Sequence, residues 1–581
     1  MNTINMQSKI CTLPNVKLNK QGYIINKSEL TISEIESIEN ELTVEPEIDI
    51  RYKKVTDDTF NIYLETISGD KIVVPRYYGI EKFGLPTNIK FNIETIDRIN
   101  IEFKGELRDY QKEIITQILE TYCTDITNPR INLKSFGGTI ISIPPGKGKT
   151  VLAIYLICIL GIRTLVVVHK TFLLNQWFER FKQYTNAEIG IIQQNHIDIS
   201  GKQIVIAMLQ SISMKDYDKE LFQAFPFIIY DECHHLGAKM FSKSLIKLQA
   251  PFYLGLSATP ERKDHLDKVF KYFLGPIGYR GTFEPNTNVM VRLYKYTIAN
   301  VNFKSLYSKF KKIYMAPTMI TNLCKIDERN NLIIKLITDT LKIDPGRKIL
   351  ILTGRCNASK NEKGVDHLKI LSDKLSKTEL ADNWGYYKGG MKKIQLEISS
   401  EKQIILGTSD MAQEGLDIPE LDTLILATPL RGDITQTCGR ILRGGASLYQ
   451  PLIYDIVDTI KPFSESARSR YGYYKSNEYT CEFYQILNGY DLDNIIKLNN
   501  SFLIPTETSL KKYKSEKTNL NNPNTDIDDE FLDESDNKIN QMNLSNHTNH
   551  ANSIELIISK TSKSKTLKLK TSKSKTSKSN N

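Results

Sequence analysis

Short apolar runs alternate with longer amphipathic stretches over most of the chain. Between about residues 100 and 285, such runs begin at Thr139, Thr164, Ile204, Phe227 and Tyr253. Short runs rich in Ile, Val and Leu, and bounded by polar residues, are typical of strands buried in a parallel sheet. The pattern therefore predicts an α/β domain in this part of the chain.

A second block with the same alternation extends from about residue 300 to 495. Its predicted strands begin at Lys348, Gln403, Thr423 and Leu452. Two α/β blocks in series predict two parallel-sheet domains with a cleft between them.

The N-terminal stretch, residues 1–95, contains no nucleotide-binding motif. Two short strands are expected in it, Phe60–Leu64 and Lys71–Pro75, around the turn Ser68–Asp70. We therefore expect an N-terminal accessory module, a first domain, a second domain and a tail, with boundaries at 1–98, 99–290, 291–500 and 501–581.

Beyond about residue 505 the sequence is rich in Asn, Asp, Ser and Lys. Residues 556–581 contain eight lysines and no acid. This segment has too little apolar surface to offset the entropy lost on ordering, so we expect the tail to be disordered. Its lysines either bind nucleic acid loosely or only keep the protein soluble.

The formal net charge is +10. The seven acids of 526–536 nearly offset the tail lysines, so the rest of the chain is basic in its own right. A basic surface suits a polyanionic partner, although solubility alone would also explain it. No apolar stretch approaches the roughly 18 residues that span a bilayer, and the N-terminus lacks the apolar segment of a secretory signal. No membrane partner is expected.

The eight cysteines occur singly along the sequence, without any CxxC pair. This distribution argues against a disulfide framework or a structural zinc site. It favours an intracellular, reducing compartment.

A candidate phosphate loop, Ile143–Thr150, follows one predicted strand and precedes the apolar helix Val151–Leu160. Glycines here allow backbone N–H groups to close around phosphate oxygens at a helix N-terminus. Lys149 would reach the β- and γ-phosphates, and Thr150 would bind Mg²⁺. Ile143 stands where the strict pattern has glycine, and the alternative is a glycine-rich turn that opens a helix. ATP would be held by Gly146, Lys147, Gly148, Lys149 and Thr150.

A candidate catalytic pair follows the predicted strand that begins at Phe227. Asp231 is placed to hold Mg²⁺, directly or through water, and Glu232 to polarise the attacking water as general base. His234 can donate a hydrogen bond across the cleft. Alone, two acids after a strand are often a solvated strand end. Their position in the same α/β block as the phosphate loop favours the catalytic interpretation.

Together with three later segments, these elements resemble the superfamily 2 DExH helicases over roughly residues 105–480. The later segments are Ser257–Thr259, Gly415–Asp417 and Gln436–Arg443. Within that superfamily, three segments of this chain resemble the XPB-like branch: Leu107–Gln111, Ser257–Asp264 and Arg468–Lys475. The N-terminal stretch resembles helicases of large cytoplasmic DNA viruses, the group of the poxvirus transcript-release helicase, at Leu42–Pro46, Phe60–Leu64 and Val74–Gly84.

The resemblance implies two tandem RecA-like domains that use ATP and Mg²⁺. Gln111 would read the adenine edge, with Arg108 nearby. Arg440 and Arg443 would reach the γ-phosphate as arginine fingers acting in cis; the alternative is an ordinary exposed helix. The residues that would sense the nucleotide or couple hydrolysis to movement are His234, Ser257, Thr259, Gly415, Asp417 and Gln436.

The resemblance also implies contacts with a nucleic-acid backbone. Small hydroxyls, helix N-termini and lysines suit phosphate contacts that carry no sequence information, so DNA and RNA stay indistinguishable. At each position, a plain helix cap is the alternative. The residues concerned are His169, Lys170, Thr171, Gln210, Ser211, Thr353, Gly354, Arg355, Thr408 and Ser409.

We therefore expect an ATP-dependent helicase or translocase. Its role would lie in viral transcription, as transcript release, or in genome processing, with the transcription machinery as partner and the host cytoplasm or the virion as location. The alternatives are an ATP-gated clamp that does not unwind and the motor subunit of a nuclease, although the sequence shows no further carboxylate–lysine cluster. The catalytic residues would be Lys149, Glu232, Arg440 and Arg443.

Overall fold

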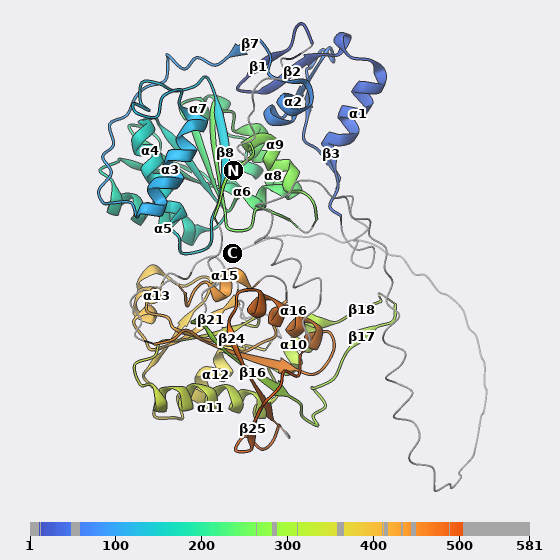
Figure 1. The fold of residues 1–581 in the computed structure, drawn as a ribbon, viewed down its shortest axis with the longest axis vertical. Coiled ribbons are helices and arrows are strands. Elements are labelled where there is room, and N and C mark those ends of the chain that lie inside the picture. Colours follow the sequence, from blue (N-terminus) through green and yellow to red (C-terminus); the bar gives the residue numbers. More distant parts are fainter. Residues whose placement is uncertain are drawn as a thin grey trace, which may run out of the picture. The chain divides into compact units, whose positions relative to one another are not determined.

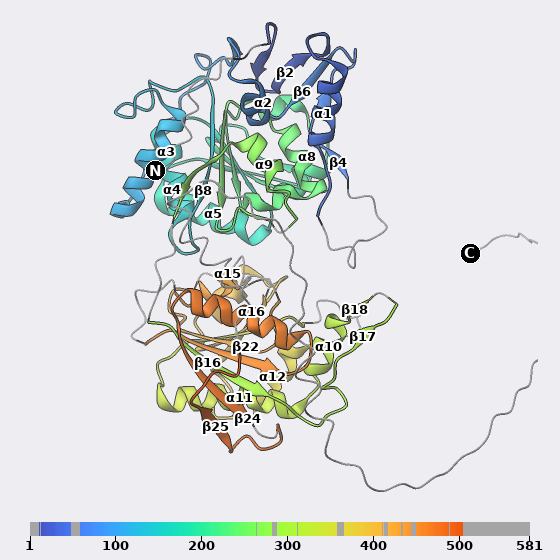
Figure 2. The ribbon, with the colours of Figure 1, turned by 45° about the vertical axis from the view of Figure 1, so that its right-hand side comes forward.

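A computed structural model gives the fold (Figures 1 and 2). It describes residues 11, 13–47, 59–262, 264–281, 288–310, 312–356, 365–409, 411, 416, 418–431, 434–442, 449–486 and 489–503. The side chains of Lys219, Lys393 and Gln436 are not described. The predicted disordered tail lies outside the described residues from residue 504 onward.

The N-terminal module is a five-stranded sheet in the order β5-β6-β2-β1-β7, with two helices. Its core contains Leu18, Tyr23, Ile25 and Ile72, all with no exposed surface. The sheet strands and helices are β1 (Lys17–Asn19), β2 (Gly22–Asn26), β5 (Leu64–Glu65), β6 (Lys71–Val74), β7 (Asn88–Lys90), α1 (Ile32–Leu42) and α2 (Arg76–Phe83).

The single strand expected over Phe60–Leu64 is wrong. The structure has two strands there, β4 (Phe60–Asn61), which pairs with β3 (Thr43–Val44), and β5 in the five-stranded sheet. The chain bends at Ile62, whose side chain is buried and whose N–H donates to the Leu42 carbonyl oxygen at 2.9 Å. Burial of Ile62 therefore redirects the chain from one sheet to the other.

Arg76 at the start of α2 fixes the module to the first large sheet. Its Nη1 and Nη2 donate to the carbonyl oxygens of Pro251 and Ala250 at 2.8 and 2.7 Å. The guanidinium also lies over the rings of Phe91 and Tyr253, 4.9 and 5.3 Å from their centroids. Paired and stacked in this way, an arginine that is only 3% exposed is tolerated in the interior.

The first large sheet has eight strands in the order β11-β10-β12-β9-β13-β14-β8-β15. All neighbouring pairs are parallel except β10 with β11. All five predicted strands are present. The strands are β8 (Gly137–Ser142), β9 (Thr164–Val168), β10 (Ile189–Gln193), β11 (His196–Ile197), β12 (Ile204–Met208), β13 (Phe227–Asp231), β14 (Phe252–Ser257) and β15 (Ile277–Arg280).

Helices cover both faces of this sheet, with α3, α4 and α5 on one side and α8 and α9 on the other (Figure 1). Alternating strand residues feed the two cores: Val166 and Val168 pack on one face, and Leu165 and Val167 on the other. The helices are α3 (Asp109–Tyr122), α4 (Lys149–Leu160), α5 (Thr171–Tyr184), α6 (Leu209–Met214), α7 (Lys219–Gln223), α8 (Lys239–Lys247) and α9 (Asp267–Leu274).

The second large sheet also has eight strands, in the order β20-β21-β19-β22-β23-β16-β24-β25. Its pairs are parallel except β24 with β25. The four predicted strands form its centre. The strands are β16 (Met290–Tyr296), β19 (Ile349–Thr353), β20 (Trp384–Tyr387), β21 (Ile404–Thr408), β22 (Thr423–Leu426), β23 (Leu452–Asp458), β24 (Thr480–Ile486) and β25 (Ile495–Leu498).

The helices of this second part again pack on two faces. Side chains of α10, α11 and α12 join one buried cluster, and those of α15 and α16 join the other. A small hairpin, β17 (Tyr307–Ser308) with β18 (Ile313–Tyr314), precedes α10. The helices are α10 (Ala316–Leu323), α11 (Asp327–Ile343), α12 (His367–Leu375), α13 (Lys393–Ser400), α15 (Thr435–Cys438) and α16 (Phe463–Ser476).

The fold class is thus confirmed as α/β with two mostly parallel sheets in tandem. The exact domain boundaries stay a prediction. No helix among the described residues is both long and apolar enough to cross a membrane.

Candidate nucleotide and nucleic-acid sites

Three predicted site segments lie at the carboxyl ends of neighbouring strands. The phosphate loop follows β8, Asp231 ends β13, and Ser257 ends β14. In the sheet, β14 lies between β13 and β8, and Ser257 pairs in register with Ser142, the last residue of β8. Parallel sheets bind ligands at this edge, so the fold brings these distant segments to one place.

The phosphate loop takes the backbone shape that its glycines allow. Gly146 and Gly148 have φ values of +81° and +78°, in the left-handed region that glycine enters without a steric penalty. Helix α4 then begins at Lys149, so the first N–H groups of the helix lack intrahelical partners and suit an anion. Lys149 Nζ donates to the Ile143 carbonyl oxygen at 3.3 Å, across the base of the loop.

Gln111 on α3 touches the outer side of this loop. Its Nε2 donates to the Lys147 carbonyl oxygen at 3.4 Å, and its Oε1 accepts from the Arg108 N–H at 3.0 Å. A Cβ atom at Gly148 would lie 2.5 Å from Gln111 Nε2. Tyr110 on the same helix also donates to the Lys147 carbonyl oxygen, at 3.1 Å. The backbone shape therefore favours glycine at position 148, and a Cβ there would also displace the Gln111 amide.

Asp231 and Glu232 are both partly buried at the end of β13. Trp177 Nε1, on α5, donates to Asp231 Oδ2 at 2.8 Å, and the Glu232 N–H donates to Asp231 Oδ1 at 3.1 Å. Burial and the charge of Glu232 raise the pKa of Asp231 to about 6. Burial also raises the pKa of Glu232, but Lys149 and the nearby histidines outweigh it, and the net pKa is lowered.

Glu232 has an unusual backbone and an open acceptor. Its φ is +48°, which is uncommon for a residue other than glycine and is associated with functional sites. Its Oε2 is buried and has no hydrogen-bond donor among the described residues. A buried carboxylate oxygen without a donor is costly, so this atom is suited to an incoming partner such as water.

His234 links the ends of β13 and β14. Its Nδ1 lies 3.0 Å from Ser257 Oγ and 3.4 Å from Glu232 Oε2. Burial lowers the pKa of His234 to about 4, although the charge of Glu232 acts in the opposite direction. The Arg262 guanidinium holds the backbone in place by donating to the His234 carbonyl oxygen at 2.6 Å. The neutral imidazole is thus fixed beside the carboxylate.

A row of three imidazoles, each tilted against the next, leads away from this position. The ring centroids of His234 and His235 are 4.3 Å apart, and those of His235 and His169 are 4.0 Å apart. His169 directly follows β9. The row therefore connects the Asp231–Glu232 pair with the first group of residues predicted to contact a nucleic-acid backbone.

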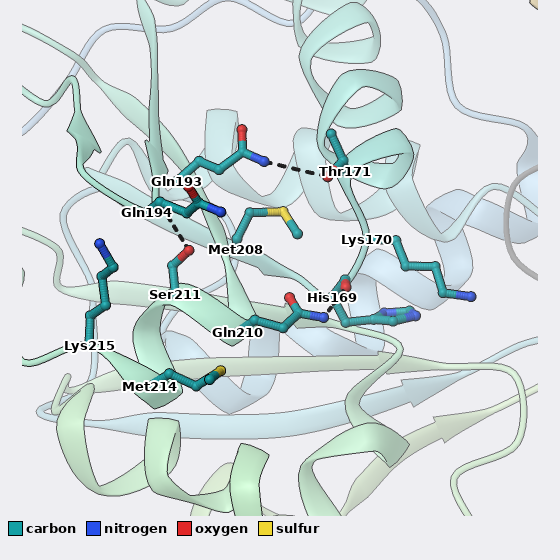
Figure 3. Close-up of a pocket in the computed structure, with 10 residues that line it drawn as sticks. All are labelled: His169, Lys170, Thr171, Gln193, Gln194, Met208, Gln210, Ser211, Met214 and Lys215. Atoms are coloured by element: carbon teal, nitrogen blue, oxygen red, sulfur yellow. Dashed lines mark hydrogen bonds between the residues drawn. The ribbon is translucent and has the colours of Figure 1, made fainter. Parts of the chain in front are cut away.

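Those residues line one pocket of about 590 Å³ (Figure 3). Gln193 Nε2 donates to Thr171 Oγ1 at 3.4 Å, and the Gln194 N–H donates to Ser211 Oγ at 2.9 Å. Gln210 donates to the His169 carbonyl oxygen. Half of the lining residues are predicted from the sequence; the others are Gln193, Gln194, Met208, Met214 and Lys215.

In the second sheet, three of the five predicted backbone contacts make internal bonds. Thr353 has no exposed surface, and its Oγ1 lies 2.8 Å from His367 Nδ1. Arg355 Nε donates to Thr321 Oγ1 at 3.0 Å, and its Nη2 donates to the Pro317 carbonyl oxygen at 2.6 Å, both on α10. The Gly354 N–H is capped by Thr428 Oγ1 at 2.8 Å. The remaining pair, Thr408 and Ser409, lies at the end of β21.

Of the two predicted arginine fingers, only Arg440 falls within the described residues. It is 5% exposed, and its Nη1 donates to the Leu416 carbonyl oxygen at 2.8 Å. This hydrogen bond therefore holds the Arg440 guanidinium within the second α/β part of the chain. Arg443, Gly415, Asp417 and the side chain of Gln436 lie outside the described residues.

Comparison with known proteins identifies the family. Residues 104–262 match the family described as type III restriction enzyme, res subunit. Protein L396 of Acanthamoeba polyphaga mimivirus, a candidate ATP-dependent RNA helicase, is 35% identical over 478 residues, which cover 81% of this chain and 87% of that protein. The chain belongs to the superfamily 2 ATP-dependent helicases.

Two further relatives of this helicase place it within the superfamily. Protein 161L of Invertebrate iridescent virus 6, a candidate helicase, is 27% identical over 72% of this chain and 90% of that protein. The DNA 3'-5' translocase XPB2 of Sulfurisphaera tokodaii is 32% identical over 38% of this chain and 46% of that protein. The predicted relation to XPB-like and viral helicases is confirmed.

Several contacts in the helicase's first domain join segments far apart in the sequence. Trp177 precedes its partner Asp231 by 54 residues, and Gln111 precedes Gly148 by 37. Spacing along the chain carries no signal for such pairs. By contrast, Gln193 and Gln194 could have been noticed, because they end the alternating run Ile189–Gln193 just before a turn.

Proposed function

We propose that this helicase hydrolyses ATP at the carboxyl ends of β8, β13 and β14 and uses the energy to move along nucleic acid. The observation that supports this most directly is the buried Glu232 carboxylate beside Lys149. It keeps one oxygen without a hydrogen-bond donor, while the charge of Lys149 keeps its pKa low. A deprotonated carboxylate with a free acceptor is what a general base for water requires.

The surrounding residues fit ATP and Mg²⁺. The Thr150 hydroxyl and the Asp231 carboxylate are hard oxygen ligands of the kind that Mg²⁺ prefers. Asp231 is a partly buried carboxylate with a raised pKa, so a neighbouring cation would stabilise its charged form. Mg²⁺ bound with ATP would neutralise phosphate charge at this position. The loop N–H groups and Lys149 would hold the phosphates, and Arg108 and Gln111 the base.

In the proposed reaction, each residue has a separate task. Glu232 accepts a proton from the attacking water, and neutral His234 lies beside the carboxylate, with its Nδ1 3.4 Å from Glu232 Oε2. Arg443 and Arg440 are the residues we assign to the γ-phosphate when ATP is bound, with Gln436 beside them. A positive group at that point stabilises charge that develops in the transition state.

The pocket lined by Lys170, Thr171, Gln210 and Ser211 is the proposed contact with the nucleic-acid backbone. Lysine, hydroxyl and amide groups gather there, and such groups bind phosphates irrespective of sequence. The row of His169, His235 and His234 joins this pocket to Glu232, which offers a physical route for nucleic acid to stimulate hydrolysis. The viral relatives support a role in viral transcription or genome processing.

The test is ATP hydrolysis by the parent and by Lys149→Ala, without nucleic acid and with single-stranded DNA, duplex DNA or RNA. We expect stimulation in the parent and near-complete loss in Lys149→Ala, because the other lysine of the loop, Lys147, has its ammonium over the Tyr110 ring and does not replace that of Lys149. Lys104→Ala, an exposed lysine away from the loop, is the matched control. Near-parent hydrolysis by Lys149→Ala would disprove the assignment.

A second candidate function is an ATP-gated clamp that binds nucleic acid without unwinding. Strand displacement on a partial duplex, measured with the same preparations, separates the two. A motor displaces the strand in an ATP-dependent manner. A clamp changes its affinity for nucleic acid with ATP but leaves the duplex intact.

A further inference from the structure

Trp177 lies on α5, and its side chain is only 1% exposed. The indole belongs to the apolar core on one face of the first large sheet. Its ring packs against Phe181, one turn further along the helix, with centroids 5.6 Å apart. Its Nε1 also donates to Asp231 Oδ2 at 2.8 Å. One buried side chain therefore joins this core to the carboxylate that we assign to Mg²⁺.

The acceptor distinguishes this hydrogen bond from that of an ordinary buried tryptophan. Most side-chain donors in proteins bond to the backbone or to water, whereas Trp177 donates to a carboxylate. Burial of an indole does not by itself bring such a partner in this chain, because the buried Nε1 of Trp384 has no acceptor among the described residues. The contact between Trp177 and Asp231 therefore needs a reason beyond burial.

Two donors hold the Asp231 carboxylate. Trp177 Nε1 donates to Oδ2, and the Glu232 N–H donates to Oδ1 at 3.1 Å. The first donor comes from α5 and the second from the chain just after β13, so the carboxylate is fixed between two elements. Each ionised oxygen keeps a further lone pair for a cation. Outer hydrogen bonds of this kind orient metal-binding carboxylates.

The helix that carries Trp177 begins in the pocket proposed for the nucleic-acid backbone. Its first residue, Thr171, lines that pocket and accepts a hydrogen bond from Gln193 Nε2 at 3.4 Å (Figure 3). Trp177 follows about 9 Å further along the helix axis, at about 1.5 Å per residue. Leu173 and Leu174, which lie between them, are buried in the same core as Trp177. The first turns of α5 therefore connect the pocket with Asp231.

This part of α5 is suited to transmit a displacement. The helix packs against β9 and β12, and Met208, the last residue of β12, also lines the pocket. Close-packed interiors are barely compressible and transmit strain, so a shift at Thr171 also moves Trp177. The row of imidazoles leads to Glu232. Helix α5 provides a separate connection, which leads to Asp231.

We propose that Trp177 is a positioning residue that holds Asp231 for Mg²⁺ and links this carboxylate to the nucleic-acid pocket through α5. Nucleic acid bound at Thr171 sets the position of the helix, and with it the affinity for ATP together with Mg²⁺. This inference rests on the proposed function. It adds a route by which nucleic acid acts on the metal-binding carboxylate, separate from the route to the general base.

The direct test removes the N–H and keeps the shape of the side chain. In a Trp384→Phe background, Trp177 is the only tryptophan of the full chain. It can then be replaced during expression by benzothienylalanine, whose sulfur stands in place of the indole N–H. Calorimetry gives the affinity for a non-hydrolysable ATP analogue. Relative to the unlabelled protein, this affinity should fall by about 10- to 100-fold with Mg²⁺ present and stay within about twofold without it.

Phe181→Leu in the same background is the matched control. Phe181 lies on the same helix and has no exposed surface, but it offers no hydrogen-bond donor. This substitution alters the packing beside Trp177 and leaves the bond to Asp231, so both affinities should equal those of the unlabelled protein.

The link to the pocket is tested by repeating the titrations with a saturating single-stranded oligonucleotide. The oligonucleotide should tighten binding of the analogue with Mg²⁺ in the unlabelled protein and in Phe181→Leu. It should have no such effect in the benzothienyl protein, although that protein binds the oligonucleotide itself as tightly as the unlabelled protein does.

Each other outcome overturns a defined part of this reasoning. Unchanged affinity of the benzothienyl protein with Mg²⁺ would make Trp177 an ordinary core residue. An equal loss with and without Mg²⁺ would place the defect in the fold rather than at Asp231. A loss confined to Mg²⁺, with the effect of the oligonucleotide intact, would exclude α5 as the connection. If the parent neither binds the analogue nor hydrolyses ATP, the proposed function itself is wrong.

Discussion

His367, the first residue of α12, should make the stability of the second sheet depend on pH. Its Nδ1 lies 2.8 Å from Thr353 Oγ1, and its Nε2 lies 2.9 Å from Asn330 Oδ1. Because a carbonyl oxygen only accepts, Nε2 carries the proton and Nδ1 accepts from the threonine hydroxyl. The neutral ring therefore satisfies both partners, and a second proton would break the bond from Thr353.

Burial, and then the positive charge of Arg329, lower the pKa of His367 to about 3 from its usual 6.5. Between these values the unfolded chain binds a proton that the folded chain does not. The contribution of neutral His367 to the free energy of unfolding is therefore fully present above pH 6.5 and is lost progressively as the pH falls towards 3. At pH 5 the loss is about 2 kcal/mol, since one pKa unit corresponds to about 1.4 kcal/mol.

The measurement compares the parent with His367→Gln, whose amide can accept from Thr353 and donate to Asn330 but does not titrate. A Trp177→Phe background leaves Trp384, on β20 of the same sheet, as the single tryptophan reporter. Urea unfolding at pH 8 and pH 5 should show about 2 kcal/mol more destabilisation in the parent than in His367→Gln. Equal losses in both proteins would refute this reasoning.

Three other substitutions test the nucleotide site. Glu232→Gln should bind ATP but turn over at least about 10²-fold more slowly, because the amide is not a base; unchanged single-turnover rates would exclude that role. Gly148→Ala should weaken binding of a fluorescent ATP analogue, because its Cβ would lie 2.5 Å from Gln111 Nε2 and displace this amide from the loop. Gly201→Ala, with φ +68° but open space around it, is the control, and equal binding by both would contradict the geometry. Arg443→Ala should retain ATP binding and lose about 10³-fold in hydrolysis. If Arg443 were a plain surface residue, the substitution would leave hydrolysis unchanged.

The sequence predicted the fold wherever strands were uniformly apolar. It missed β16, Met290–Tyr296, although this strand lies inside the second sheet between β23 and β24. The reason is visible in its side chains, because Arg292 interrupts the apolar pattern. Arg292 Nε donates to Glu482 Oε2 at 3.1 Å on the adjacent β24. A polar residue satisfied by a neighbouring strand cannot be recognised from one segment alone.

The candidate site, like the fold, could be predicted from the sequence only in part. Gly146, Lys149, Asp231 and Glu232 could be selected from local sequence, because a loop before a helix and acids after a strand are contiguous patterns. The pKa shifts of these side chains could not be predicted from local sequence. The raised pKa of Asp231 depends on burial and on Glu232, and these follow from packing between segments that are remote in the chain.

The sequence predicted the same role for Arg440 and Arg443, but in the structure Arg440 has a hydrogen-bond partner within its own part of the chain. Its guanidinium is buried and donates to the carbonyl oxygen of Leu416, which stands between Gly415 and Asp417 in the sequence. Removing a buried donor leaves its acceptor unsatisfied, at a cost of about 1–3 kcal/mol. Arg440 is therefore suited to holding these two segments together as well as to reaching phosphate. Of the two arginines, we therefore expect Arg443 to act most directly in hydrolysis.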